Sequence, residues 1–134
     1  MSETDLQRAI LEALEAKGYR AERINSGNMV FLQTLKSGKE KRYRFRGARK
    51  NTPDILVLKP YLWLETKTPI GKASPGQLEW HAWAEANGIR AKFVRSIGEA
   101  LRYVDRCARD DAVRGIVASG GWPWLAELIV QQDQ

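Results

Sequence analysis

Residues 53–67 read PDILVLKPYLWLETK, in which two apolar runs flank a Lys-Pro turn. Asp54 precedes the first run, and Glu65 and Lys67 close the second. Apolar runs of this length around a proline turn predict two neighbouring antiparallel strands. The start of one strand then lies beside the end of the other. Counting outward from the turn, Asp54 is expected opposite Glu65 or one residue to either side, so the hairpin predicts two carboxylates and an ammonium group at one end of a sheet.

The second strand of this hairpin directs its charged side chains to one side. Because successive strand residues point to opposite faces, Glu65 and Lys67 project together. Two carboxylates a few ångströms apart repel each other unless they share a proton or a cation. A structural salt bridge to Lys67 is one way to offset this repulsion. The other is a divalent ion, and an oxygen-only site without His or Cys suits Mg²⁺ or Mn²⁺.

The segments on both sides of the hairpin predict an α/β fold. Ser74-Pro75-Gly76-Gln77 has the capping sequence of a helix start, and Gly88 ends that helix. The strands 61–67 and 89–95 are then joined by a helical crossover, which makes them parallel. Before the hairpin, the spacing of apolar residues and the turn residues predict a helix after Ser2 and strands at 19–25, 29–35 and 41–46. After residue 95, they predict a helix from Ser96 and a last helix after Gly120. The expected class is α/β with a mixed sheet.

Length and composition predict one domain in a reducing compartment. The chain has 134 residues, which matches a single hydrophobic core. One cysteine excludes an internal disulfide and favours the cytoplasm. The first residues lack the basic and apolar regions of a signal peptide, and no apolar run approaches the length of a membrane helix. A protein without a membrane segment is therefore expected.

Positive charge is concentrated in residues 36–50, KSGKEKRYRFRGARK. This segment has a balance of +7 within a net charge of +6, which leaves −1 for the rest of the chain. Such a segment, interleaved with Tyr43 and Phe45, favours phosphate binding, and a solvated hairpin is the alternative. No recognition helix or finger is evident, so backbone contacts without sequence readout are expected. The expected DNA-binding residues here are Lys41, Arg42, Arg44, Arg46, Arg49 and Lys50.

The order Pro53-Asp54, ten residues, then Glu65-Thr66-Lys67 resembles the motif of the PD-(D/E)XK nucleases. Further segments are similar to the virus-type replication-repair nuclease (VRR-NUC) domain, found in stand-alone phage and bacterial proteins and at the C-terminus of an animal DNA-repair nuclease. These segments are ETDLQ at 3–7, RINSG at 23–27, KTP at 67–69 with SPGQ at 74–77, and VRS at 94–96. The resemblance implies a restriction-endonuclease-like core in the order α-β-β-β-α-β, plus a C-terminal helix.

The resemblance also implies roles at matched positions. Asp54 and Glu65 would ligate Mg²⁺ together with the carbonyl oxygen of Thr66, and Lys67 would orient the attacking water or stabilise the transition state. Glu3 would complete the metal shell directly or through water, with Glu12 as the alternative. Gln77 would lie near the scissile phosphate, or simply cap its own helix. Asn25 and Ser26 are expected beside the DNA, although Asn25 can alternatively cap the turn in which it lies. Arg95 either contacts phosphate or is solvated.

The resemblance spans residues 3–105 of a single domain, 1–134, with a helical tail at about 110–134. Stand-alone members resemble Holliday-junction resolvases, which implies a metal-dependent endonuclease acting on branched DNA. Two cuts in a four-way junction suggest a homodimer. A candidate dimer surface is formed by Trp122, Trp124, Leu125 and Leu128. The alternatives are a flap or restriction-type nuclease and a non-catalytic module that binds branched DNA.

Overall fold

The computed structural model describes residues 1–24, 28–118, 120 and 131, with the backbone alone for residues 28–31, 44–46 and 117–118. Within this described part, three helices and six strands follow the order α-β-β-β-β-β-α-β-α. They are α1 (Glu3–Ala16), β1 (Ala21–Arg23), β2 (Asn28–Thr34), β3 (Glu40–Arg46), β4 (Ile55–Val57), β5 (Leu62–Thr66), α2 (Pro75–Ala86), β6 (Ala91–Val94) and α3 (Ile97–Ala118).

Four strands form a mixed sheet in the spatial order β1-β4-β5-β6. Neighbours β1, β4 and β5 are antiparallel, whereas β5 and β6 run parallel and are joined by the crossover through α2. Ile55 pairs with Leu64, so the next pair outward sets Asp54 opposite Glu65. The expected α/β class, the parallel crossover and the register of the hairpin are all confirmed.

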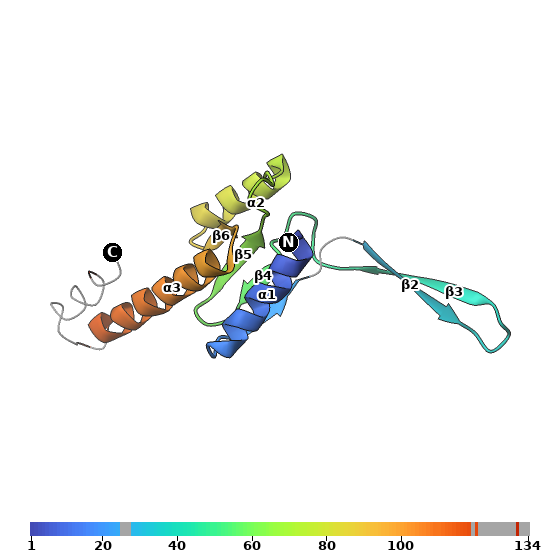
Figure 1. The fold of residues 1–134 in the computed structure, drawn as a ribbon, viewed down its shortest axis with the longest axis horizontal. Coiled ribbons are helices and arrows are strands. Elements are labelled where there is room, and N and C mark those ends of the chain that lie inside the picture. The colour runs from blue at the N-terminus through green and yellow to red at the C-terminus, as the bar shows by residue number, and fades with distance from the viewer. Residues whose placement is uncertain (25–27, 119, 121–130, 132–134) are drawn as a thin grey trace.

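The strands β2 and β3 pair with each other in a separate two-stranded sheet. This β2–β3 ribbon projects away from the rest of the protein (Figure 1). The sequence predicted both strands but not their separation from the main sheet. Since the ribbon lies between β1 and β4 along the chain, the remaining elements follow the expected order α-β-β-β-α-β, with α3 as the C-terminal helix.

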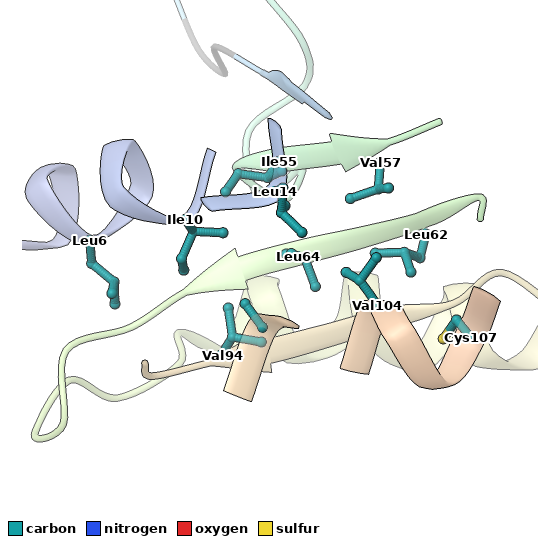
Figure 2. Packing of buried hydrophobic residues seen from close by; sticks show 11 residues of the cluster. Leu6, Ile10, Leu14, Ile55, Val57, Leu62, Leu64, Val94, Val104 and Cys107 are labelled. Atoms are coloured by element: carbon teal, nitrogen blue, oxygen red, sulfur yellow. The ribbon is translucent and has the colours of Figure 1, made fainter. Parts of the chain in front are cut away.

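One face of the main sheet packs against α1 and α3 (Figure 2). Helix α1 begins with a capping box between Ser2 and Asp5, and its apolar residues at every fourth position are the buried ones. Burial of this apolar surface is the main source of stability and fixes β5 from one side. The shared core consists of Leu6, Ile10, Leu14, Ile55, Val57, Leu62, Leu64, Val94, Ala100, Val104 and Cys107.

Helix α2 covers the opposite face of the sheet. Its Trp80 meets Trp63 of β5 edge to face, with ring centroids 5.6 Å apart. Its His81 stacks on Phe93 of β6 at 3.9 Å, and burial lowers the pKa of His81, which favours the neutral ring. With layers on both faces, the charged end of β5 lies in a largely dehydrated environment.

Helix α3 is longer than the pattern after Ser96 suggested. It continues to Ala118 and crosses the boundary expected between a core ending at 105 and a tail from 110. No proline interrupts residues 97–118, so nothing in the backbone stops the helix earlier. None of the described helices combines the length and apolar character needed to cross a lipid bilayer. The expected dimer surface at residues 122–128 lies outside the described residues.

A polar contact joins the end of α1 to α3. Asp105 accepts a hydrogen bond from the hydroxyl of Tyr19 at 2.6 Å and forms an ion pair with Lys17. Burial, together with the Asp105 carboxylate, raises the pKa of Tyr19 to about 12. Burial alone would raise the pKa of Asp105, but the hydrogen bonds from Lys17 and Tyr19 outweigh it and lower that pKa.

We predict that Asp105→Asn lowers the free energy of unfolding by about 1 kcal/mol near neutral pH, because a charge-assisted hydrogen bond and a partly exposed ion pair are lost. The lowered pKa means that this stabilisation is present above the unfolded value of 3.8 and disappears as the pH falls through the folded value. Urea unfolding as a function of pH measures both effects.

The matched control for this experiment is Asp110→Asn on the same helix, since no described residue forms a hydrogen bond or ion pair with Asp110. Its stability should follow that of the unaltered protein at every pH. Equal losses in the two variants would mean that the contact between α1 and α3 does not stabilise the fold.

Candidate active site

Asp54 is fixed at the point where β4 begins. Its Oδ2 atom accepts hydrogen bonds from the backbone N–H of Thr66 at 2.9 Å and from the Thr66 hydroxyl at 2.8 Å. Its carbonyl oxygen accepts the backbone N–H of Ile24 at 2.7 Å. Asp54 thus ties the ends of β1 and β5 together. Both side-chain bonds use one oxygen, and no described residue donates to Oδ1.

Glu65, opposite Asp54, is almost completely buried, with a relative exposure of 2%. Its Oε1 atom accepts a hydrogen bond of 2.5 Å from Nε2 of Gln77. Its Oε2 atom is buried and has no hydrogen-bond partner among the described residues. Buried polar atoms are nearly always paired, so an unpaired carboxylate oxygen points to a water, an ion or a catalytic role.

The environment of Glu65 strongly disfavours its charged form. Burial raises its pKa to about 8, and the charge of Asp54 contributes to the rise. Lys67 and the backbone N–H of Asp54 act in the opposite direction without cancelling it, and Glu3 adds a further small rise. The environment of Glu65 therefore favours the protonated carboxyl group, whereas a bound cation would favour the carboxylate.

Lys67 follows β5 directly and is also buried. Its backbone N–H donates to the carbonyl of Val94 at 2.9 Å, which extends the parallel pairing by one residue. Its Nζ atom lies 3.9 Å from Oε1 of Glu3, in the first turn of α1. The structure therefore brings Glu3 to the site through Lys67. Glu12, the alternative, is exposed further along α1.

Gln77 caps its own helix, one of the two roles expected from the sequence, and also contacts Glu65. Its Oε1 atom accepts the backbone N–H of Ser74 at 3.0 Å and so completes the capping box of α2. Its Nε2 atom donates to Glu65. A single amide therefore fixes the start of α2 and the orientation of the buried carboxyl group.

The oxygen donors at this edge fit Mg²⁺ or Mn²⁺. Mg²⁺ is commonly bound by one or two carboxylates and keeps several water ligands. Asp54 and Glu65 supply two carboxylates from adjacent strands, and the unpartnered Oε2 of Glu65 is the kind of atom an ion would satisfy. Among the described residues, no three His, Cys, Asp or Glu side chains gather into a metal-binding group. The carbonyl of Thr66 and the Glu3 carboxylate remain predicted further ligands.

The basic residues expected to bind DNA are distributed along β3 and the loop after it. Lys41 and Arg42 are exposed near the turn end of the β2–β3 ribbon, where they pair with Gln33 and Leu32, and Lys41 Nζ lies 5.1 Å from the centre of the Tyr43 ring. Arg44 and Arg46 follow in the same strand. The ribbon therefore extends this basic sequence away from the sheet. Asn25 and Ser26 lie outside the described residues.

The loop between the ribbon and β4 is held against α2. It carries the exposed residues Arg49 and Lys50, followed by Asn51, whose φ of 73° is unusual for a residue other than glycine. A Cβ atom on Gly76 would lie 2.4 Å from the Asn51 amide, so the glycine permits this contact. A glycine in the first turn of a helix is a signal of close approach that sequence reasoning could have used.

Arg95 has a role that neither sequence interpretation anticipated. Its Nη1 atom donates to the carbonyls of Thr68 and Gly71, both at 2.7 Å, and approaches that of Pro69 at 3.5 Å. The loop after Lys67 is thereby fastened to the end of β6. Only the parallel pairing of β5 and β6 brings these distant residues together, so no local pattern could have revealed the contact.

No family model, curated protein or solved structure matches this chain. The interpretation of the site therefore depends on its own residues and geometry.

We predict that Mg²⁺ raises the melting temperature of the protein and that Glu65→Gln abolishes this rise. At ten times its Kd, an ion bound only to the folded state adds about 1.4 kcal/mol, which corresponds to a few degrees. In EDTA the variant should melt at or above the unaltered protein, because the amide removes a buried ionisable group that faces Asp54. Thermal denaturation with and without Mg²⁺ measures both effects.

The control is Glu79→Gln, an exposed position on α2, which should retain the full response to Mg²⁺. If Glu65→Gln responded to Mg²⁺ as strongly as the unaltered protein, the ion would have to bind elsewhere.

Proposed function

We propose that this protein is a Mg²⁺-dependent endodeoxyribonuclease that hydrolyses phosphodiester bonds in branched DNA. The main support is the buried carboxyl group of Glu65, which lies opposite Asp54 and beside Lys67 and has an unpartnered oxygen. Among the described residues, the ion pair of Lys67 is with Glu3 rather than with Glu65. Strongly shifted carboxyl groups next to a buried lysine are typical of catalytic sites.

The residues that would hold the ion are Asp54 and Glu65, with the Thr66 carbonyl and Glu3 as further ligands. Bound there, Mg²⁺ would polarise a phosphate oxygen and lower the pKa of a coordinated water. The hydrogen bonds from Thr66 fix Asp54, and Gln77 fixes Glu65, so both carboxylates are already oriented before substrate arrives.

Lys67 is assigned the stabilisation of the transition state. Its ammonium group is buried at the end of β5, and in the absence of substrate its nearest carboxylate ion-pair partner is Glu3 at 3.9 Å. A charge held in a dehydrated site interacts more strongly with the developing charge on phosphate than an exposed one would. Lys67 can alternatively orient the attacking water from the same position.

The β2–β3 ribbon is assigned the backbone contacts with DNA. Ile24, before the ribbon, is hydrogen-bonded to Asp54, which follows the loop of residues 47–53 after the ribbon, so the segment that carries the ribbon leaves and returns at the site. A strand of seven residues spans about 24 Å at roughly 3.4 Å per residue. Duplex DNA rises about 3.4 Å per base pair, so the ribbon can follow about seven base pairs beyond the cut.

Branched DNA is the preferred substrate class because of the resemblance to VRR-NUC and resolvase-type nucleases. Cutting both strands of a four-way junction requires two such sites, which is the reason to propose a homodimer. A flap nuclease, a restriction-type nuclease and a non-catalytic DNA-binding module are the alternatives. The intact set of Asp54, Glu65 and Lys67 favours an enzyme over the last of these.

We predict that Lys67→Ala lowers the rate of Mg²⁺-dependent cleavage by about 10²–10³-fold, as expected for a lost transition-state contact, and leaves DNA affinity nearly unchanged. The assay compares a four-way junction, a flap, a single strand and a linear duplex of matched sequence. The control variant is Lys59→Ala, in the turn at the opposite end of β5, which should cleave normally.

Each outcome of this panel separates the alternatives. Faster cleavage of the flap or of one duplex sequence would favour the corresponding nuclease, and junction binding without cleavage would favour the non-catalytic module. If the intact protein cut none of the four substrates, the enzyme proposal would be wrong. A parallel loss of binding in Lys67→Ala would make the lysine a phosphate anchor.

We predict that the double variant Lys41→Ala/Arg42→Ala binds all DNA sequences more weakly. The slope of log affinity against log salt should fall by up to about 1.8, because each lost phosphate contact contributes roughly 0.9. The control is Arg106→Ala/Arg114→Ala on α3, two exposed residues whose removal changes the net charge equally. Fluorescence anisotropy titrations at several salt concentrations give the slopes. Equal slopes for the two double variants would exclude the ribbon as the binding surface.

A further inference from the structure

The loop of residues 68–73 connects two parts of the candidate site. It begins after Lys67 at the end of β5 and ends at Ser74, which caps α2 beside Gln77. Anything bound at Lys67 therefore lies next to this loop. Neither the metal ligands nor the basic ribbon accounts for its conformation.

Three contacts hold the loop in one shape. The backbone N–H of Gly71 donates to the carbonyl of Thr68 at 3.1 Å and closes a turn. Arg95 binds the carbonyls of the same two residues at 2.7 Å each. A Cβ atom on Gly71 would lie 2.9 Å from the Thr68 hydroxyl, so a larger residue at this position would require the Thr68 side chain to move.

This turn holds Ile70 in water. Its relative exposure of 91% is the highest among the large apolar side chains that the structure describes. Its neighbours Pro69 and Lys72 are exposed as well. Single exposed apolar residues are common on protein surfaces. Ile70 differs because its turn is anchored by Arg95 and follows Lys67 by only three residues.

We propose that Ile70 is a specificity-determining residue that inserts between DNA bases beside the scissile phosphate. The inference rests on the proposed function, since it needs DNA at Lys67. A phosphate held at Lys67 brings the adjoining base step against the loop. Proteins that distort DNA insert apolar side chains such as Ile, Leu or Phe between base steps in this way. The exposed ammonium group of Lys72, two residues further, can contact the neighbouring phosphate.

Insertion of Ile70 explains selectivity for DNA structure without sequence readout. In a continuous duplex the side chain must separate two fully stacked base pairs, whereas at a branch point the strands exchange and the same separation costs less. The cost of breaking one stacking step corresponds to a preference of about tenfold for branched over continuous DNA. The loop therefore supplies discrimination that a backbone-binding ribbon cannot.

The test uses Ile70→Gln, which keeps the size of the side chain but makes insertion into a base stack unfavourable, and Ile70→Met, which keeps an apolar side chain. Leu58→Gln is the matched control, because Leu58 is an exposed apolar residue in the turn at the other end of the sheet. The DNA carries 2-aminopurine at the branch point of a four-way junction, or at the same position in a linear duplex. Its fluorescence reports unstacking, with Ca²⁺ replacing Mg²⁺ so that cleavage does not interfere.

We expect the unaltered protein, Ile70→Met and Leu58→Gln to raise the fluorescence of the junction and to retain the preference for cutting it. Ile70→Gln should lose most of the fluorescence rise, and its preference for the junction should fall about tenfold. Fluorescence and preference unchanged in Ile70→Gln, or lost equally in Leu58→Gln, would overturn the inference. An equal loss of cleavage on both substrates with normal fluorescence would also overturn it.

The fluorescence measurement separates this inference from the proposed function. If the unaltered protein unstacks the branch point but cleaves nothing, the nuclease proposal fails and the insertion of Ile70 stands. If it cleaves the junction without a change in fluorescence, the nuclease stands and the insertion fails. If it neither binds nor cleaves DNA, both fail.

Discussion

The burial of one carboxyl group, that of Glu65, is the constraint on which the arrangement of the candidate site depends. Strand β5 is covered by α1 and α3 on one face and by α2 on the other. A residue at its end is therefore removed from water, and an ionised carboxylate there is unfavourable. The fold tolerates Glu65 because the apolar layer beneath it is continuous, and because Gln77 and Lys67 compensate part of the lost hydration.

Parts of the protein that lie outside the sheet are attached to it through residues of the site or next to it. Ile24 and Asp54 join the two ends of the ribbon, and Asn51 presses the returning loop against Gly76 of α2. Arg95 fastens the loop after Lys67. These attachments link the ribbon and the two loops to the strands that carry Asp54 and Glu65.

The sequence predicted those features that have a local cause. Capping boxes at Ser2 and Ser74 marked helix starts, and apolar runs around a proline turn placed Asp54 within one residue of its position opposite Glu65. The separation of the β2–β3 ribbon was not predictable, since a strand pattern does not state which strand it will pair with. The role of Arg95 depends on the register of two parallel strands, and the pairing of Glu3 with Lys67 depends on how α1 packs. Such contacts arise only after the elements assemble.

The independence of the β2–β3 ribbon has a consequence for how this fold can vary. None of its described side chains belongs to the hydrophobic core. With respect to the main sheet, the ribbon is therefore part of a long loop between Ile24 and Asp54, which are hydrogen-bonded to each other. The entropy of closing a loop grows only with the logarithm of its length, and doubling that length costs about 0.6 kcal/mol. The ribbon can therefore lengthen or shorten by insertion and deletion, while the core that positions the carboxylates keeps its stability.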